Sequence, residues 1–258
     1  MEFDALRARL DDLCRRSARG EVGVSDFLTP KDINYSRKYL TRAGQKFLSF
    51  GGYDDAERSR IYVLPEYLEA AESVSDVEQY GFSSDVVALL VSTDGYRQLS
   101  HRDYLGSILG MGVERDVIGD ILVLDDGGKS AVVLCTESIS HYLCTHLCRI
   151  STEKARVRCV SIDEIEIPER KTQKINDTVA SPRLDCIVGA VCSLSREKAR
   201  AAVEGGLVEL DFECEQRADR TVATPCIVSV RGHGRFRINS VSDVTKKGRY
   251  RLNAEKFV

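Results

Sequence analysis

Apolar side chains recur every three or four positions at the start of the chain, and this spacing predicts a helix over 1–19. A second helix is predicted from Pro30 to about Gln45, because proline suits the first helical turn. Short apolar runs at 47–50 and 60–64 predict two strands joined by the turn-rich GGYDDAE. The first 84 residues are therefore predicted to form a small α+β unit.

The stretch 85–168 has a clearer pattern, in which predicted strands and helices follow one another in the order β-α-β-β-α-β. The strands are 85–92, 117–125, 130–136 and 155–165, and the helices are 101–112 and 138–150. This order is typical of the ferredoxin-like fold, which many RNA-recognition domains share. Such domains stack bases on aromatic side chains of their central strands, but 117–123 and 129–136 contain no Phe, Tyr or Trp. A packing or docking role is therefore the favoured interpretation of this domain.

The remaining residues predict a linker followed by a third domain. The polar, aperiodic segment 169–180 is interpreted as the linker. In 181–258, a first helix is predicted to begin at Ser181-Pro182 with Ser181 as its cap, and a second runs from Ser195 to Gly205-Gly206. The short strands LVELDFE, CIVSVRG and RFRINSV follow. The predicted fold class is α+β throughout, ending in two helices on a small twisted sheet.

Composition limits the class of protein. The 258 residues are 43% apolar and 30% charged. This apolar fraction is enough to form hydrophobic cores and excludes a wholly disordered chain. No apolar run is long enough to cross a bilayer, and the charged N-terminus lacks the apolar region of a secretory signal. The nine cysteines are scattered, which favours reduced thiols over a disulfide framework. We expect a cytoplasmic protein without membrane insertion.

Charge is spread unevenly along the chain. The net charge of −3 combines a net −7 over 1–180 with a net +4 over 181–258. Residues 231–251 contain seven basic residues and a single acidic one, Asp243. A basic end on an acidic body indicates either a local site for a polyanion or a solvated basic tail.

The C-terminal domain resembles the S-four domain, a small RNA-binding module, through SPRLD (181–185), SREKA (195–199), GGLVELD (205–211) and VSVRGHGRF (228–236). Arg183 is expected in the first turn of one helix, and Arg196 and Lys198 in the first turn of the next. Free backbone N–H groups beside a guanidinium make a good phosphate site. Asp185 either belongs to the site or orients Arg183. The resemblance implies RNA binding by Arg183, Ser195, Arg196, Lys198 and Arg231. The predicted RNA-binding set also includes Asp185, Asp211, Arg235, Arg237, Lys246, Lys247 and Arg249.

Two positions depart from the S-four pattern. The family commonly has Asn where this chain has Asp211, and Gly-Asp where it has Thr224-Pro225. An acid at 211 is expected to weaken phosphate contact locally, and the turn before CIVSV is expected to differ in shape.

The rest of the chain resembles the bacterial YlmH family. The resemblance rests on FLTP (27–30), GGYDDAERSR (51–60), HRDYLGSILGMGVERDVIGDILV (101–123), VRGHGRFRI (230–238) and KKGR (246–249). It implies an N-terminal unit and an RNA-recognition-like middle domain before an S-four domain. It also implies an RNA-binding, ribosome-associated factor, encoded beside cell-division genes and tied to rescue of stalled translation on the large subunit.

Enzyme and metal motifs are incomplete. His101-Arg102-Asp103 matches part of a kinase catalytic loop, but Ile108 occupies the position that needs Asn. GMGVER lacks the third glycine of a dinucleotide-binding loop. His141, Cys144 and Cys148 share a helical face, but the CxxC pair typical of structural zinc is missing, which favours a buried thiol pair. We therefore expect no enzyme activity, no cofactor and no metal.

The leading hypothesis is a non-enzymatic protein that binds ribosomal RNA or tRNA on the large ribosomal subunit, in translation quality control. The acidic upstream domains would position it or bind a protein partner. Two alternatives remain: a protein-interaction scaffold linked to cell division, with incidental RNA affinity, and an RNA-modifying enzyme.

Overall fold

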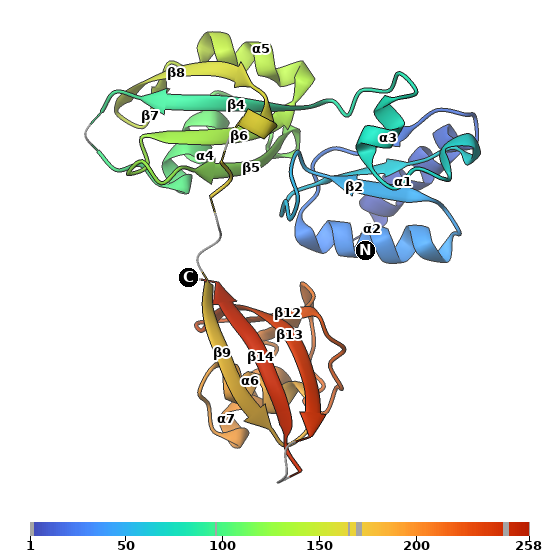
Figure 1. The fold of residues 1–258 in the computed structure, drawn as a ribbon, viewed down its shortest axis with the longest axis vertical. Helices are drawn as coiled ribbons and strands as arrows, with labels where there is room; N and C mark the ends of the chain where they lie inside the picture. Colours follow the sequence, from blue (N-terminus) through green and yellow to red (C-terminus); the bar gives the residue numbers. More distant parts are fainter. Residues whose placement is uncertain (1–2, 96, 165, 169–171, 245–247, 258) are drawn as a thin grey trace. The chain divides into compact units, whose positions relative to one another are not determined.

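The computed structural model describes residues 3–95, 97–164, 166–168, 172–244 and 248–257. The chain forms two compact units, Met1–Pro168 and Glu169–Val258 (Figure 1). Mixed helices and antiparallel sheets in both units confirm the α+β class. In the part of the chain that the structure describes, no helix is long and apolar enough to cross a membrane.

The start of the first unit closely follows the sequence prediction. Its helices and strands are α1 (Asp4–Ser17), β1 (Gly23–Val24), α2 (Pro30–Arg42), β2 (Phe47–Phe50), β3 (Arg60–Val63), a 3-10 turn (Glu66–Leu68) and α3 (Val74–Glu78). The Thr29 hydroxyl caps α2 by accepting a hydrogen bond from the Asp32 N–H, with Pro30 in the first turn. The strands pair in the order β1-β3-β2, and Leu10 and Leu40 of the helices pack on Ile61 in the core.

The second half of this unit has its own sheet, with strand order β5-β6-β4-β8-β7. Its elements are β4 (Val86–Thr93), α4 (His101–Leu109), a 3-10 turn (Arg115–Val117), β5 (Ile118–Val123), β6 (Ser130–Thr136), α5 (Glu137–His146), β7 (Arg149–Ile150), β8 (Glu153–Val160) and a 3-10 turn (Ile162–Glu164). The main elements follow the predicted order β-α-β-β-α-β. Tyr104 of α4 and Leu143 of α5 share one core with Leu89 and Val133 of the sheet.

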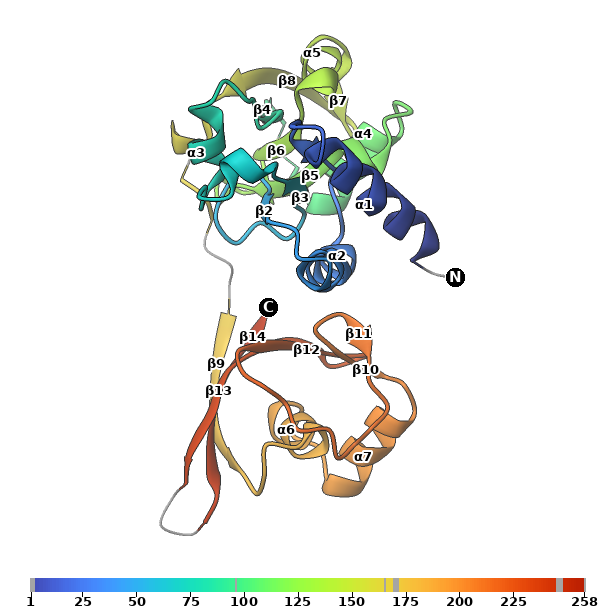
Figure 2. The ribbon, with the colours of Figure 1, turned by 90° about the vertical axis from the view of Figure 1, so that its right-hand side faces the viewer.

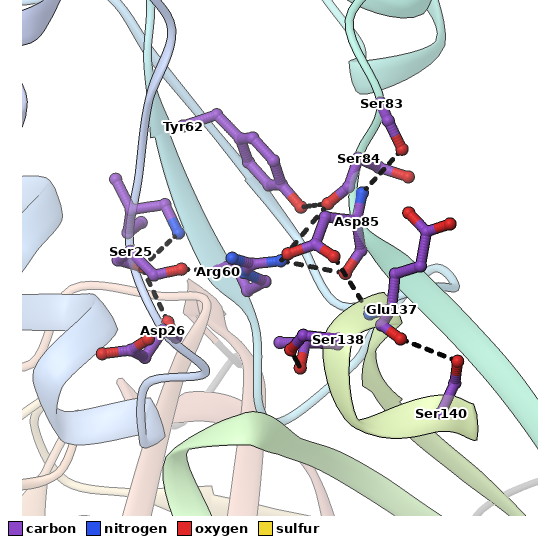
Figure 3. A network of polar contacts seen from close by, with 12 residues as sticks. Ser25, Asp26, Arg60, Tyr62, Ser83, Ser84, Asp85, Glu137, Ser138 and Ser140 are labelled. Carbon is purple, nitrogen blue, oxygen red and sulfur yellow. Dashed lines mark hydrogen bonds and ion pairs between the residues drawn. The ribbon is translucent and has the colours of Figure 1, made fainter. Parts of the chain in front are cut away.

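A buried arginine ties the two halves of the first unit together (Figure 3). The Arg60 guanidinium on β3 donates to the Ser25 carbonyl at 2.7 Å and to the Asp85 carboxylate at 2.6 Å. The Asp85 carboxylate also accepts the Glu137 N–H at 3.0 Å, where α5 begins and a negative charge is favourable. The predicted boundary between 84 and 85 therefore lies inside one compact unit, although each half keeps a core of its own.

The loop 51–60 makes a second junction between the halves. The Asp120 carboxylate on β5 accepts the Tyr53 hydroxyl and the N–H groups of Glu57 and Arg58, at 2.7–3.0 Å. The Arg58 guanidinium in turn donates to the carbonyls of Phe27, Arg115 and Ile118. The motifs GGYDDAERSR, FLTP and IGDI thus meet at one junction, where they hold the architecture together.

The second unit contains β9 (Thr172–Val179), α6 (Leu184–Val191), α7 (Arg196–Glu204), β10 (Val208–Leu210), β11 (Glu213–Cys214), β12 (Cys226–Val230), β13 (Gly234–Val244) and β14 (Tyr250–Phe257). Its sheet has the order β11-β10-β12-β13-β14-β9 and is antiparallel throughout. Figure 2 shows α6 and α7 on the concave side of this curved sheet. Leu184, Ile187 and Val188 of α6 are fully buried there, each burial contributing roughly 1.5–3 kcal/mol.

The linker predicted at 169–180 is wrong for its described part. Residues 172–179 form β9, which pairs along its whole length with β14. Only Ile175 and Val179 face the core from β9, so two apolar side chains in a polar octet concealed an edge strand. The sequence prediction also ended its strands at RFRINSV and missed β14.

The start of the first C-terminal helix also differs from prediction. Arg183, not Ser181, occupies the N-cap position of α6. The carbonyls of Arg220 and Ala218 accept the N–H groups of Leu184 and Asp185, at 2.9 and 3.1 Å. A distant segment therefore supplies the capping that was expected from Ser181.

Candidate nucleic-acid interface

Arg183 and Asp185 form an ion pair at the start of α6. The Arg183 Nε and Nη2 atoms donate to the two Asp185 carboxylate oxygens at 3.0 and 2.7 Å, a bidentate geometry. The Asp185 side chain is 1% exposed, whereas that of Arg183 is 35% exposed. Asp185 is therefore the buried support, and it holds a guanidinium whose remaining N–H groups can face a ligand.

The contacts between Arg183 and Asp185 favour the charged form of both side chains. Burial by itself would raise the pKa of Asp185, but the hydrogen bonds and charge of Arg183, together with the Cys186 contacts, outweigh burial and lower that pKa. The hydrogen bond that Arg183 donates to Asp185 raises the pKa of Arg183. Of the two sequence interpretations of Asp185, the geometry fits the one in which it orients Arg183.

The N-terminus of α6 does not offer the free N–H groups that the sequence led us to expect. The Leu184 and Asp185 N–H groups donate to loop carbonyls, and the Cys186 N–H donates to the Asp185 carboxylate at 2.9 Å. These bonds consume the donors that a phosphate would need at this helix start. The ligand-binding capacity of the α6 tip therefore lies in the Arg183 side chain.

The start of α7 agrees with the sequence prediction. Ser195 is the N-cap, and its hydroxyl accepts the Lys198 N–H at 3.4 Å. Arg196 and Lys198 follow in the first turn and are both exposed. The cap fixes where α7 begins and thereby the direction in which these two cations leave the helix.

Sequence reasoning missed one basic residue of this region, Arg200. It follows Arg196 by four positions, so both project from the same side of α7. Arg200 lies close enough to Arg183 and Asp185 for both charges to influence its pKa, although the hydrogen bond and charge of Glu204 dominate and raise that pKa. The i, i+4 spacing was the signal that could have found it. We call Arg183, Arg196, Lys198 and Arg200 the helix-tip cluster.

Other predicted site residues lie elsewhere on the unit. Arg231 is exposed in the turn after β12, where its N–H donates to the Leu207 carbonyl just beyond the end of α7. The nine residues of α7 span about 13 Å, so Arg231 and Arg196 sit at opposite ends of that helix. Arg231 therefore does not join the helix-tip cluster.

Arg235 and Arg237 lie on the other side of the sheet. Along β13 the side chains of Phe236 and Ile238 enter the core beneath the helices. Neighbouring side chains of a strand point to opposite faces, so Arg235 and Arg237 point away from α6 and α7. The structure thus divides the predicted cations between two faces.

Of the four remaining predicted site residues, Asp211 and Arg249 make contacts within the second unit. The Asp211 carboxylate accepts the Ile227 N–H at 2.8 Å and its own N–H donates to the Ile227 carbonyl, so this acid joins β12 to the β10–β11 turn at a φ of +49°. Arg249 binds the Thr178 hydroxyl at 2.8 Å and the Thr178 carbonyl. Lys246 and Lys247 lie outside the described residues.

The His101-Arg102-Asp103 segment is a helix start. The Asp103 carboxylate accepts the Ser100 hydroxyl at 2.7 Å and the Ser100 N–H at 2.8 Å, and these bonds lower its pKa. The Cys144 sulfur lies 3.8 Å from that of Cys159, and Cys148 is exposed, so the prediction of a buried thiol pair is wrong. Among the described residues, no group of three or more His, Cys, Asp or Glu side chains could hold a metal ion.

Comparison with known proteins shows which family the chain resembles. Residues 3–68 match the family model "YlmH, N-terminal", and residues 82–164 match "Putative RNA-binding domain in YlmH". The chain is 27% identical over 233 residues to the ribosome-associated protein quality control protein P2 of Bacillus subtilis, covering 90% of this chain and 86% of that protein. The solved structure of the cell division protein ylmH from Streptococcus pneumoniae shares the fold, with a TM-score of 0.52 and 16% identity over 64% of this chain and 94% of that one. On these matches, the chain belongs to the YlmH family.

Proposed function

We propose that this protein is a non-enzymatic RNA-binding factor that contacts ribosomal RNA or tRNA on the large ribosomal subunit. Its role would be quality control of translation and rescue of stalled ribosomes, in the cytoplasm. The Bacillus subtilis relative is named for ribosome-associated quality control, and the family model over 82–164 is described as RNA-binding. Both support the proposal.

The observation that carries it is the helix-tip cluster. Arg183 is held by a buried carboxylate, which removes much of the entropy that a free arginine would lose on binding phosphate. Exposed Arg196 and Lys198 extend the positive charge along the start of α7. A rigid guanidinium beside further cations suits the sugar–phosphate backbone of folded RNA, and contacts of this kind position a protein without reading sequence.

The proposal includes the domain identities. We assign 82–164 to a ferredoxin-like, RNA-recognition-type domain, and the second unit to an S-four-type domain. The strand order β5-β6-β4-β8 and the two helices packed on one face of the other sheet support these assignments. We also propose that the acidic first unit positions the protein or contacts a protein partner.

Ribosome co-sedimentation tests the proposal. Arg183→Ala/Arg196→Ala should lower the ribosome-bound fraction and weaken binding to unrelated structured RNAs alike, because phosphate contacts are insensitive to sequence. Arg19→Ala/Arg42→Ala is the matched control, since it removes the same charge from exposed positions of the first unit. Equal sedimentation of wild type and the Arg183/Arg196 variant would refute the proposal.

Two further measurements separate the alternatives. A protein partner that is retained after nuclease treatment of a pull-down, with no RNA in the untreated sample, would favour a scaffold role. A nucleoside modification missing from ribosomal RNA of a deletion strain, detected by mass spectrometry, would favour an enzyme.

A further inference from the structure

The second unit has a sheet face that its own helices α6 and α7 do not cover, formed by the opposite side of β12, β13, β14 and β9. In Figure 1 this side of β9, β14 and β13 faces the viewer. The strand register defines rows of side chains across it. The rows are Ser229–Arg235, Ile227–Arg237–Glu255–Lys174, Ser240–Asn253–Asn176 and Ser242–Arg251–Thr178. We call this surface the open face.

Two arginines of the open face lie over aromatic rings. The Arg235 guanidinium carbon is 5.4 Å from the centre of the Phe212 ring, and that of Arg237 is 5.6 Å from the centre of the Phe257 ring. A guanidinium packed on a ring is held in place, and its other planar side can stack on a base. Proteins that bind unpaired nucleotides stack bases on aromatic rings and on guanidinium planes.

Three asparagines form a line of amides across the same face. Asn239 donates to the Asn253 amide oxygen at 2.8 Å, and Asn253 donates to that of Asn176 at 3.0 Å. Each amide has two N–H donors and an oxygen acceptor, so this line retains hydrogen-bonding capacity. Side-chain amides complement the donor and acceptor edges of bases.

The amides border a shallow depression of about 590 Å³. The side chains of the open face that line it are Asn176, Thr178, Ser240, Ser242, Arg251 and Asn253, and Asp177 and Leu252 of the same strands also border it. Hydroxyl and amide groups therefore surround one cation, Arg251, whose side chain is exposed and has no hydrogen-bonding or ion-pair partner among the described residues. The depression offers both polar edges and a positive charge to a ligand.

The charged side chains of the open face favour a nucleic acid over a protein as its ligand. The rows hold four cations, Lys174, Arg235, Arg237 and Arg251, against one acid, Glu255. Among the described residues, the apolar side chains of this face are Ile227 and the two rings beneath the arginines, Phe212 and Phe257, whereas the core of a protein–protein interface is mostly apolar. Amides, arginine planes and excess positive charge together match a nucleic acid strand.

We propose that the open face is a second RNA-contact surface, which takes unpaired nucleotides on the opposite side of the sheet from the helix-tip cluster. This proposal rests on the proposed RNA-binding function and extends it, because the second unit then contacts RNA through two opposite faces. One face holds the backbone of folded RNA, and the other holds bases that are not paired.

Fluorescence anisotropy on the full-length protein tests this, with a labelled unstructured 12-nucleotide RNA of mixed sequence and a labelled RNA hairpin. Arg237→Ala/Arg251→Ala should weaken binding of the unstructured RNA by about tenfold or more, because phosphate contacts and a stacking surface are lost. Binding of the hairpin should change less than about twofold. The helix-tip variant Arg183→Ala/Arg196→Ala should show the reverse pattern, and Arg19→Ala/Arg42→Ala should change neither.

Arg251→Glu is the second variant, because Arg251 is exposed and its replacement leaves the Arg237–Phe257 contact in place. It should also weaken the unstructured RNA selectively. Competition adds an independent readout: excess unlabelled hairpin should leave the labelled unstructured RNA bound. Wild-type affinity of Arg251→Glu for the unstructured RNA, or full displacement of that RNA by the hairpin, would overturn the second surface while leaving the helix-tip proposal intact. Loss of both RNAs only from the helix-tip variant would also overturn it, and binding of neither RNA by the wild type would overturn both proposals.

Discussion

Replacing Asp185 by asparagine tests the central claim about the helix-tip cluster. The Asp185 carboxylate is almost fully buried and accepts hydrogen bonds from Arg183 Nε, Arg183 Nη2 and the Cys186 N–H. Asp185→Asn preserves the shape of the side chain but removes its charge and one of its acceptor oxygens. Arg183 would then lose the support that sets its direction.

The size of the effect follows from the exposure of the two partners. Breaking a fully buried ion pair costs about 3–5 kcal/mol, but Arg183 is 35% exposed and can regain water. We therefore expect a loss of about 2 kcal/mol in the free energy of unfolding. For a unit of about 90 residues, this lowers Tm by roughly 8–16 °C.

The pH dependence gives this prediction a sign. Because the pKa of Asp185 is lowered in the folded protein, its contribution is present at neutral pH and is lost as the pH falls through that lowered pKa. Thermal melts from pH 7 down to pH 3 should show the wild type and Asp185→Asn converging below about pH 4. Curves that stay parallel over this range would contradict the assigned cause.

RNA affinity provides the functional readout. Loss of a negative charge near phosphate would by itself strengthen binding, whereas loss of Arg183 orientation weakens it. We expect Asp185→Asn to bind a structured RNA about threefold to tenfold more weakly at a temperature where it remains folded. Asp219→Asn is the matched control, because Asp219 is an exposed acid whose charge also acts on Arg183. If both variants bind RNA more tightly than wild type, the orienting role of Asp185 is refuted.

Three further changes test other parts of the structure. Asp85→Asn should destabilise the first unit by about 2 kcal/mol, seen as a lower midpoint in urea, because the buried Arg60 guanidinium loses its carboxylate partner; an unchanged midpoint would argue against this junction. Ser195→Ala should cost about 1 kcal/mol through loss of the α7 cap, measured by thermal melting, while Ser195→Thr should retain most of that stability. Gly128→Ala should cost more than about 1 kcal/mol, since φ is +76° and a Cβ would lie 2.3 Å from the Leu99 carbonyl oxygen; Gly127→Ala, at a similar φ with open space, is the control that isolates the steric contribution in the same melts.

Much of the fold could be predicted where local pattern and tertiary packing agree. The helices at Pro30, His101 and Ser195 begin within one residue of their prediction, because capping side chains lie beside an apolar periodic stretch. β9 escaped prediction because an edge strand needs few inward apolar residues. The start of α6 also escaped it, since its capping carbonyls come from Ala218 and Arg220, more than thirty positions away.

The candidate site was predictable in its parts but not in its arrangement. Ser195 and Arg196 were found because they sit in a recognisable helix start, and Arg183 was found through its place in SPRLD. Arg200 was missed although its i, i+4 spacing from Arg196 places both side chains on one side of α7. The division of Arg235 and Arg237 from the helix tips follows from the alternation in RFRI, a pattern available from the sequence that was interpreted as charge alone.

The pairing of β9 with β14 has a practical consequence for dissecting the protein. A fragment that starts at Ser181 would lack β9 (Thr172–Val179), which forms one edge of the sheet. The backbone amides and carbonyls of β14 on that side would then be unpaired over eight positions, a template onto which another chain can add. Such a fragment is expected to aggregate or to exchange strands between copies. The shortest soluble C-terminal fragment must therefore start before Thr172.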